Sequence, residues 1–146
     1  MAKKIPAFKK LVTIKNDSRV DLFIELDCHE FSWNCPATQQ VDFGRVFITY
    51  TPFKKIAETK SLKAYLVQYR YKNAFNEELA VRILQDLVYY LEPMKMTVRL
   101  IQTSRGGIQN TSIASWDYER EQDKEAAEEY KPKATFQGGW AMEKEK

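Results

Sequence analysis

Apolar and polar side chains alternate in two segments of the first third of the chain. Residues 19–27, with the sequence RVDLFIELD, carry apolar side chains at every second position and mostly acidic side chains between them. A period of two that includes β-branched residues predicts a half-buried strand. Residues 43–51, FGRVFITYT, are predicted to form a second strand that ends before Pro52. Residues 29–42 are expected to form a long loop, and long loops in compact domains often carry function.

The spacing of apolar residues then becomes helical. In residues 59–71 they recur at i, i+3, i+4 and i+7, which places them on one helix face. That face consists of Leu62, Tyr65, Leu66 and Tyr69. Residues 76–93 show a second helical stripe, with Asn76 as the expected N-cap and Pro93 as the stop. Two consecutive helices are therefore predicted.

The last part of the chain returns to alternation. Residues 96–103 predict a third strand and residues 106–116 a fourth. The order ββααββ predicts an α+β fold, with an antiparallel four-stranded sheet and two helices on one face. We expect a loosely held basic N-terminal arm at 1–17, the folded domain at 18–118, and a charged C-terminal helix and tail at 119–146.

Composition narrows the class of protein. A chain of 146 residues has the size of one domain, and its formal net charge of +3 permits an anionic ligand without demanding nucleic acid. No apolar run approaches the roughly 20 residues of a membrane span, and no apolar segment follows the basic start MAKKIPAFKK. We therefore expect a cytoplasmic protein without membrane contact, in which thiols stay reduced.

The chain has two cysteines, Cys28 and Cys35, and one histidine, His29. Their spacing fits no zinc template, so no metal site is expected, and a disulfide is not expected in the cytosol. Cys28 lies at the end of the first predicted strand and is interpreted as structural. Cys35 precedes Pro36 in the predicted loop, with Asp42 seven residues further on. The residues alone leave Cys35 open as a buried filler or a nucleophile.

Four segments resemble, in order and spacing, the 7-cyano-7-deazaguanine reductases of queuosine biosynthesis. They are FSWNCPATQQVDF, ETKSLKAYLVQYR, FNEEL and SRGGI, and the resemblance extends over residues 19–116. It includes the cofactor signature Glu-x-Lys-Ser-x-Lys, from Glu58 to Lys63. The resemblance implies the tunnelling fold (T-fold) of GTP cyclohydrolase I and the NADPH-dependent reduction of 7-cyano-7-deazaguanine to 7-aminomethyl-7-deazaguanine. It also implies a homo-oligomer of two pentamers, with the sheets joined into a barrel, active sites at subunit interfaces and no stable nucleic-acid complex.

The family's nucleophile and general acid match Cys35 and Asp42. A nitrile carbon accepts a hydride poorly until a nucleophile adds to it, and a thiolate adds well, giving a thioimide. A free thiol with a pKa of ~8.5 is only a few per cent ionised at neutral pH, so the site must supply positive charge or a base. The nitrile nitrogen then needs a proton, which a positioned carboxylic acid such as Asp42 can give.

The resemblance assigns the other site residues to two ligands. A guanine-like ring offers an N–H and an amino group side by side, and one carboxylate can accept from both. The implied substrate-binding residues are Glu58, Thr59, Asn76 and Glu77. A helix start with lysines favours phosphate groups, and the chain contains no Gly-x-Gly-x-x-Gly segment. The implied NADPH-binding residues are Lys60, Ser61, Lys63, Arg105 and Gly106.

Asn76 departs from the family, which has histidine at this position. Asparagine can hold a hydrogen bond but cannot carry a proton at neutral pH, so we expect slower turnover. Two alternatives stay open: an archaeosine-type amidinotransferase, which keeps the cysteine and the aspartate but uses ammonia, and a non-catalytic module that binds a deazapurine or tRNA. The lysine-rich signature favours the reductase, and the pair of Cys35 and Asp42 argues against a non-catalytic module.

Overall fold

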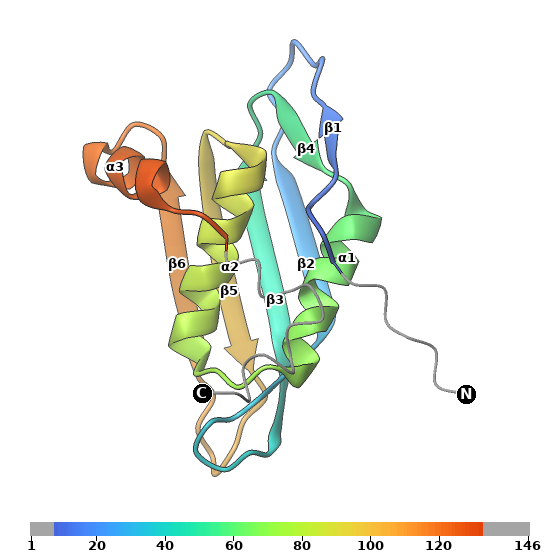
Figure 1. Cartoon of the computed structure of the whole chain (residues 1–146), viewed down its shortest axis with the longest axis vertical. Coiled ribbons are helices and arrows are strands. Elements are labelled where there is room, and N and C mark those ends of the chain that lie inside the picture. Colours follow the sequence, from blue (N-terminus) through green and yellow to red (C-terminus); the bar gives the residue numbers. More distant parts are fainter. Residues whose placement is uncertain (1–7, 133–146) are drawn as a thin grey trace.

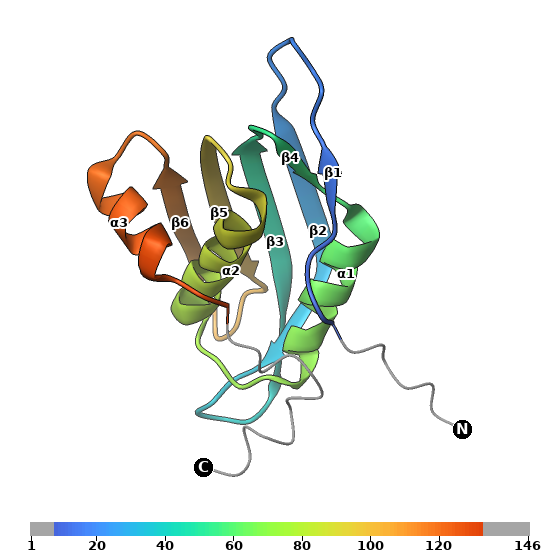
Figure 2. The ribbon, with the colours of Figure 1, turned by 45° about the horizontal axis from the view of Figure 1, so that its top comes forward.

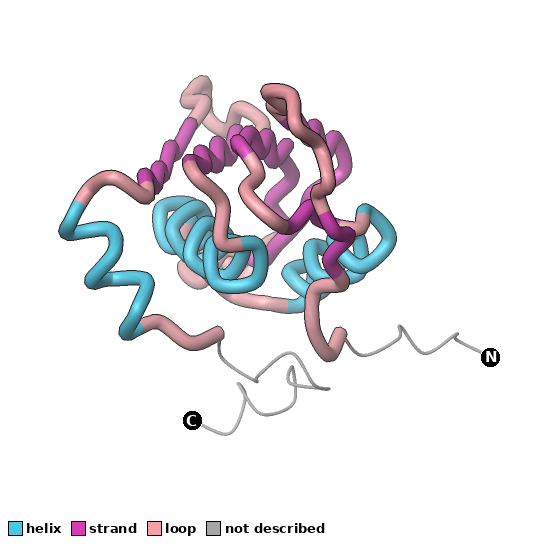
Figure 3. The backbone as a smooth tube through the Cα atoms, turned by 90° about the horizontal axis from the view of Figure 1, so that it is seen from above, coloured by secondary structure: helices cyan, strands magenta, loops and turns pink. Residues whose placement is uncertain are grey.

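The computed structural model describes residues 8–132. The elements in chain order are β1 (Thr13–Lys15), β2 (Ile24–Asn34), β3 (Val41–Thr51), β4 (Lys55–Ala57), α1 (Thr59–Val67), the 3-10 helix η1 (Gln68–Tyr71), α2 (Asn76–Leu91), β5 (Lys95–Gln102), β6 (Thr111–Asp117) and α3 (Glu121–Glu129). A four-stranded antiparallel sheet has the order β2-β3-β5-β6, and β1 pairs with β4 in a separate two-stranded sheet. Helices α1 and α2 lie on one face of the larger sheet (Figure 1, Figure 2 and Figure 3). The predicted order ββααββ is confirmed, with β1 and β4 added to it.

The core lies between the larger sheet and its two helices. Asp42, Val46, Ile48 and Tyr50 of the central strand β3 are buried, and the last three each lie opposite a buried residue of β5. A slip of one residue would turn these side chains to the other face, so the apolar pattern specifies the register. Helix α2 contributes the buried stripe Leu79, Ile83, Leu87 and Leu91. The face predicted for the first helix is buried as well.

The prediction of a long loop over residues 29–42 is wrong. Strand β2 continues to Asn34, and only a short turn separates it from β3. The pairing of β2 with β3 shifts between Cys28 and Phe31, where two consecutive residues are exposed. A bulge adds an unpaired residue and interrupts the period of two, so alternation no longer signals the strand beyond it.

The N-terminal boundaries differ from their predictions in two ways. Strand β2 begins at Ile24 rather than at residue 19, and Val20 is 77% exposed. The arm expected to be loosely held is instead packed from Phe8 onward, because Phe8 and Leu11 are buried and β1 pairs with β4. Two apolar side chains among lysines form no periodic pattern, so only the tertiary contacts reveal their burial.

A buried polar cluster connects α2 to the segment that follows α3. The carboxylate of Asp86 is fully buried and accepts hydrogen bonds from the hydroxyl groups of Tyr65 and Tyr130. The hydroxyl oxygens of Tyr65 and Tyr69 lie 2.8 Å apart. Burial raises the pKa of Asp86, and the tyrosine hydrogen bonds oppose this rise. Buried polar groups need such partners, so we interpret the cluster as structural.

Within the charged C-terminal segment, residues Glu121–Glu129 form helix α3. It packs against α2 and β6, and the indole Nε1 of Trp116 donates to the Asp123 carbonyl oxygen (3.1 Å). Most of the predicted tail falls outside the described residues. Within residues 8–132, every helix is too short or too polar to cross a membrane.

Candidate active site

The turn between β2 and β3 holds Cys35. The N–H of Cys35 donates to the Gln40 carbonyl oxygen (2.9 Å), and the N–H of Gln39 donates to the Cys35 carbonyl oxygen (2.8 Å). Gln39 adopts the left-handed conformation with a φ of 58°, which reverses the chain within a few residues. These contacts fix the backbone around the half-buried side chain of Cys35.

The same turn changes the chemistry of the Cys35 thiol. The hydroxyl of Thr38, followed by the backbone N–H groups of Thr38 and Ala37, hydrogen-bonds the sulfur and lowers the pKa of Cys35. Partial burial and the nearby carboxylate of Asp42 oppose this effect without reversing it. A lower pKa increases the thiolate fraction at neutral pH, and the thiolate is the nucleophile. Hydrogen bonds from the turn therefore stabilise the thiolate, a role that was expected of a positive charge or a base.

Asp42 follows this turn as the second residue of β3 and is 4% exposed. Arg105 forms an ion pair with the Asp42 carboxylate. The same guanidinium donates to the side-chain oxygen of Gln40 (2.6 Å) and to the carbonyl oxygen of Val41 (3.3 Å). Arg105 thus connects the buried carboxylate to the turn that holds Cys35.

Arg105 comes from the tip of the β5–β6 hairpin. Its N–H donates to the Ile108 carbonyl oxygen (2.9 Å), and the intervening Gly106 and Gly107 have φ values of 58° and 79°. Two consecutive positive φ values are typical of a type I′ hairpin turn, which glycine adopts without strain. Gly106 therefore shapes the hairpin that brings Arg105 to Asp42.

The start of α2 places Asn76 and Glu77 at the same end of the sheet. The expectation that Asn76 caps the helix is wrong, because Phe75 is the N-cap residue and Asn76 is the first helical residue. The side-chain Nδ2 of Asn76 instead donates to Oε1 of Gln102 (2.6 Å). The exposed Glu77 carboxylate accepts from Nδ2 of Asn110 (3.0 Å).

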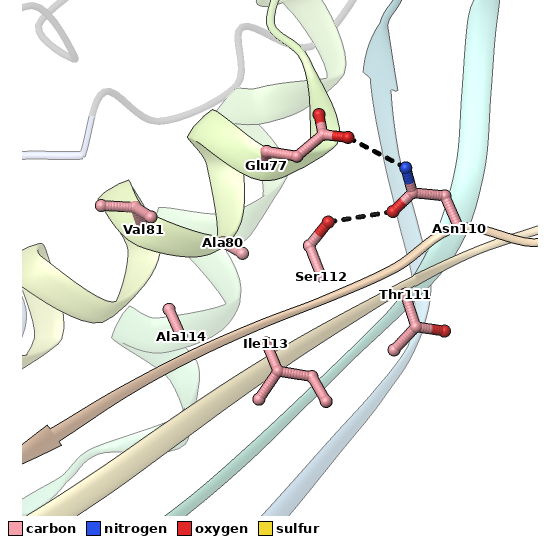
Figure 4. Close-up of a pocket in the computed structure, with 8 residues that line it drawn as sticks. All are labelled: Glu77, Ala80, Val81, Asn110, Thr111, Ser112, Ile113 and Ala114. Carbon is pink, nitrogen blue, oxygen red and sulfur yellow. Dashed lines mark hydrogen bonds between the residues drawn. The ribbon is translucent and has the colours of Figure 1, made fainter.

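A hollow of about 550 Å³ lies between the first turns of α2 and strand β6 (Figure 4). Its lining residues are Glu77, Ala80, Val81, Asn110, Thr111, Ser112, Ile113 and Ala114. The side chains of Glu77, Asn110 and Ser112 lie together at one end, and Ala80 and Ala114 face each other further along (Figure 4). The hollow therefore joins hydrogen-bonding groups to a small apolar wall.

The start of α1 holds the lysine-rich signature. Glu58 is the N-cap, and its carboxylate accepts from the N–H groups of Lys60 (2.8 Å) and Ser61 (2.7 Å), which lowers the pKa of Glu58. The Ser61 hydroxyl donates to the Glu58 carbonyl oxygen (2.9 Å) and accepts from the Val12 N–H (2.9 Å). The side chains of Glu58 and Ser61 thus help to build the helix start, while Lys60 and Lys63 are exposed.

Comparison with known proteins identifies the family. Residues 41–122 match the family described as QueF-like protein. A relative in Helicobacter pylori, named NADPH-dependent 7-cyano-7-deazaguanine reductase, is 43% identical over 104 residues, which cover 71% of this chain and 70% of the relative. The chain belongs to the QueF-like family.

Two further comparisons extend this result. A QueF-like relative with the same reductase name in Rhodopirellula baltica is 41% identical over 93 residues, which cover 64% of this chain and 77% of the relative. The crystal structure of the archaeosine synthase QueF-Like in the apo form aligns with a TM-score of 0.61 and 22% identity, over 64% of this chain and 91% of that chain. At this identity the likeness shows the fold alone, and it confirms the predicted T-fold.

The predicted site residues of this QueF-like chain form two groups. At the lower end of the sheet in Figure 1, the β2–β3 turn, the β5–β6 hairpin and the start of α2 gather. They carry Cys35, Asp42, Asn76, Glu77 and Arg105. Helix α1 begins higher in the same view, beside β4, with Glu58, Thr59, Lys60, Ser61 and Lys63. Across residues 8–132, no three His, Cys, Asp or Glu side chains are grouped so that they could hold a metal ion.

Sequence reasoning missed four polar residues that contact the first group. Thr38 and Gln40 lie in the turn after Cys35, where a polar residue within hydrogen-bond reach of the thiol is a usable local signal. Gln102 and Asn110 flank the hairpin tip and contact the start of α2. Their role depends on how the hairpin packs against the helix, which no local pattern encodes.

Proposed function

We propose that this QueF-like chain reduces the nitrile of 7-cyano-7-deazaguanine to the primary amine of 7-aminomethyl-7-deazaguanine, a step of queuosine biosynthesis, with NADPH and through a thioimide on Cys35. The two relatives described above, at 43% and 41% identity, carry the reductase name. The observation that carries the proposal is the turn that lowers the pKa of Cys35 beside Asp42. A free thiol at this position suits the reducing cytoplasm expected from the sequence.

The first step belongs to the turn that holds Cys35. The thiolate attacks the nitrile carbon and forms a C–S bond, while one C–N π bond becomes a lone pair on nitrogen. The Asp42 carboxylate takes up the proton that the Cys35 thiol releases and passes it to this nitrogen, which leaves a neutral thioimide and an Asp42 carboxylate. Arg105 stabilises the carboxylate that results, because its guanidinium pairs with that group.

The start of α1 fits the phosphate groups of NADPH. Each of two NADPH molecules, bound in turn, would supply one of the two hydrides that convert the nitrile carbon to the amine carbon. The Glu58 carboxylate already occupies the N–H groups of Lys60 and Ser61, so these backbone donors are not free for a phosphate. The anion contact therefore falls to the exposed ammonium groups of Lys60 and Lys63. Arg105, engaged with Asp42, acts at the Cys35 end of the site.

We assign recognition of the substrate ring to Glu77. Its carboxylate is exposed at the hollow beside α2 and has acceptor positions left for the ring N–H and the exocyclic amino group. Asn76 lies one residue earlier and is held by Gln102. A fixed amide at this position can orient the substrate, although it cannot relay a proton at neutral pH.

A second copy of the chain completes the site in this proposal, within a decamer of two pentamers. The start of α1, which carries Lys60 and Lys63, and the β2–β3 turn lie toward opposite ends of the sheet in Figure 1, so a ligand that contacts both needs a neighbouring copy. Strands β2 and β6 are the edges of an open sheet, and edge strands can pair with one another between copies. The sheet face away from the helices carries Phe43, which is 62% exposed, and Ile113, which is 60% exposed.

The test is NADPH absorbance in the presence of the nitrile. We expect two NADPH to be oxidised for each nitrile consumed, and no nitrile-dependent oxidation with Cys35→Ala. Cys28→Ala is the matched control and should retain activity. If NADPH is untouched while ammonia is incorporated, the chain is an amidinotransferase of the archaeosine type. If the nitrile binds and is recovered unchanged, the chain is a binding module.

A further inference from the structure

The β5–β6 hairpin contacts three of the residues expected at the site. Arg105 pairs with Asp42, Gln102 accepts from Asn76, and Asn110 donates to Glu77. The N–H of Gln102 also donates to the Asn110 carbonyl oxygen (2.9 Å), so the last two contacts come from opposite strands of one ladder. The hairpin, which the resemblance connected with the cofactor, therefore also supports the groups that face the substrate ring.

The contact with Glu77 is backed by a second hydrogen bond. The hydroxyl of Ser112 donates to Oδ1 of Asn110 (2.9 Å), and Nδ2 of Asn110 donates to Oε1 of Glu77 (3.0 Å). Figure 4 shows Asn110 joined by hydrogen bonds to both Glu77 and Ser112 at one end of the hollow. They come from the first turn of α2 and from the β6 side of the hairpin.

Chemistry allows only one direction for this chain of hydrogen bonds. An ionised carboxylate only accepts, so Asn110 must present its NH₂ group to Glu77. The amide oxygen then faces Ser112, whose hydroxyl must donate. The Glu77 carboxylate therefore selects the amide orientation of Asn110, and the Ser112 hydroxyl adapts to it by donating to the amide oxygen, which anchors the Asn110 side chain.

We propose that Asn110, anchored by the hydrogen bond from Ser112, is a positioning residue that presets the Glu77 carboxylate for a ring with two adjacent N–H donors. This inference rests on the proposed function and specifies how its substrate is recognised. Glu77 is exposed on the first turn of α2, where an unanchored side chain would sample several rotamers. One hydrogen bond from Asn110 restricts that freedom and leaves both carboxylate oxygens able to accept from the ring.

The test compares two ligands that lack the nitrile, so that recognition is measured apart from the covalent step. 7-Deazaguanine presents the ring N–H and the exocyclic amino group, whereas 7-deazahypoxanthine lacks the amino group. Calorimetric titration should show that the full-length protein prefers 7-deazaguanine. Asn110→Ala should weaken 7-deazaguanine about 3- to 10-fold, with a smaller change for 7-deazahypoxanthine, so that the preference shrinks.

Two further variants keep the test decisive. Ser112→Ala should also reduce the preference for 7-deazaguanine, but by less than Asn110→Ala does. If Asn110→Ala lowers the thermal midpoint of unfolding, Ser112→Ala replaces it in the test. Ser115→Ala is the matched control, because Ser115 is exposed on the same strand, β6, and does not line the hollow. In turnover, Asn110→Ala should raise KM for the nitrile and change kcat less than about 2-fold.

Several results would overturn the inference. It fails if the native chain shows no preference between the two ligands, if Asn110→Ala weakens both equally, or if Ser115→Ala reproduces the effect. It also fails if kcat falls while KM is constant. Failure of the proposed function looks different, because the native chain would then bind and discriminate the two rings without oxidising NADPH when the nitrile is added.

Discussion

Cys28 and Cys35 lie on the same strand–turn segment but in opposite chemical environments. Cys28 is in the ladder of β2, opposite Val46, and burial, followed by the charge of Asp27, raises the pKa of its thiol. Cys35 lies just beyond the end of β2, and hydrogen bonds from Thr38 and Ala37 lower the pKa of its thiol. One thiol is thus kept neutral and packed against the core, and the other is activated.

The difference comes from where the backbone N–H groups point. In a strand they are used by the neighbouring strands, so a thiol in the ladder gains no donors from its own backbone. In the turn after β2 successive N–H groups point inward, and such a concave arrangement favours an anion. The position of Cys35 at a strand end, rather than any feature of cysteine itself, lowers the pKa of its thiol and favours it as the proposed nucleophile.

Replacing each cysteine in turn by alanine should distinguish Cys35 from Cys28 and give the largest expected effect on the rate. Cys35→Ala should lower nitrile-dependent NADPH oxidation by at least about 10³-fold, because the covalent route is lost. Cys28→Ala removes a half-buried sulfur and should leave the rate within about 3-fold. Steady-state kinetics on both variants measure this. Equal losses of NADPH oxidation in the two variants would mean that Cys28 and Cys35 do not differ in function.

Asn76 tests whether activation of Cys35 suffices for the whole reaction. The native chain should form the thioimide normally but oxidise NADPH slowly, because the amide cannot deliver a proton in the later reduction. Asn76→His should raise kcat, and a positioned acid is typically worth about 10²–10⁴-fold. Single-turnover kinetics would separate thioimide formation from reduction. If the native chain already turns over as fast as the histidine variant, asparagine is a neutral replacement.

The lysines of α1 test whether cofactor binding is separate from the turn that holds Cys35. Lys60→Ala or Lys63→Ala should raise KM for NADPH about 10- to 100-fold, as expected for a hydrogen bond to a charged group. Formation of the Cys35 thioimide without NADPH should be unchanged. Lys15→Ala is the control, since its side chain is 82% exposed on β1. Equal losses of thioimide formation and cofactor binding would argue against two separate groups.

Substitution of Thr38 tests what lowers the pKa of Cys35, and it should give the smallest effect of these variants. The rate of thiol alkylation follows the thiolate fraction, so it rises with pH and levels off above the pKa. Thr38→Ala should raise the pKa of Cys35, move this curve to higher pH and slow alkylation about 3- to 10-fold at neutral pH. Thr38→Ser keeps the hydroxyl and should restore the native alkylation curve. Superimposable curves for Thr38→Ala and the native chain would exclude the hydroxyl as the cause.

The sequence predicted the sheet and the helix pair because their apolar side chains repeat with the period of their structure. It failed where the period is interrupted, as at the bulge between Cys28 and Phe31, or absent, as around Phe8. For the site, the family resemblance paired Cys35 with Asp42, although the short turn that separates them was expected to be part of a long loop. The contact between Asn110 and Glu77 spans 33 residues and depends on the packing of a hairpin against a helix, so no local pattern could predict it.

The central claim is that Cys35, and not Cys28, attacks the nitrile. The most direct measurement is peptide mapping by mass spectrometry after the native chain has been mixed with 7-cyano-7-deazaguanine in the absence of NADPH. We predict that the mass of the substrate is added at Cys35 only, at neutral pH, and that Cys35→Ala carries no added mass. Addition at Cys28, or addition that persists in Cys35→Ala, would contradict the account.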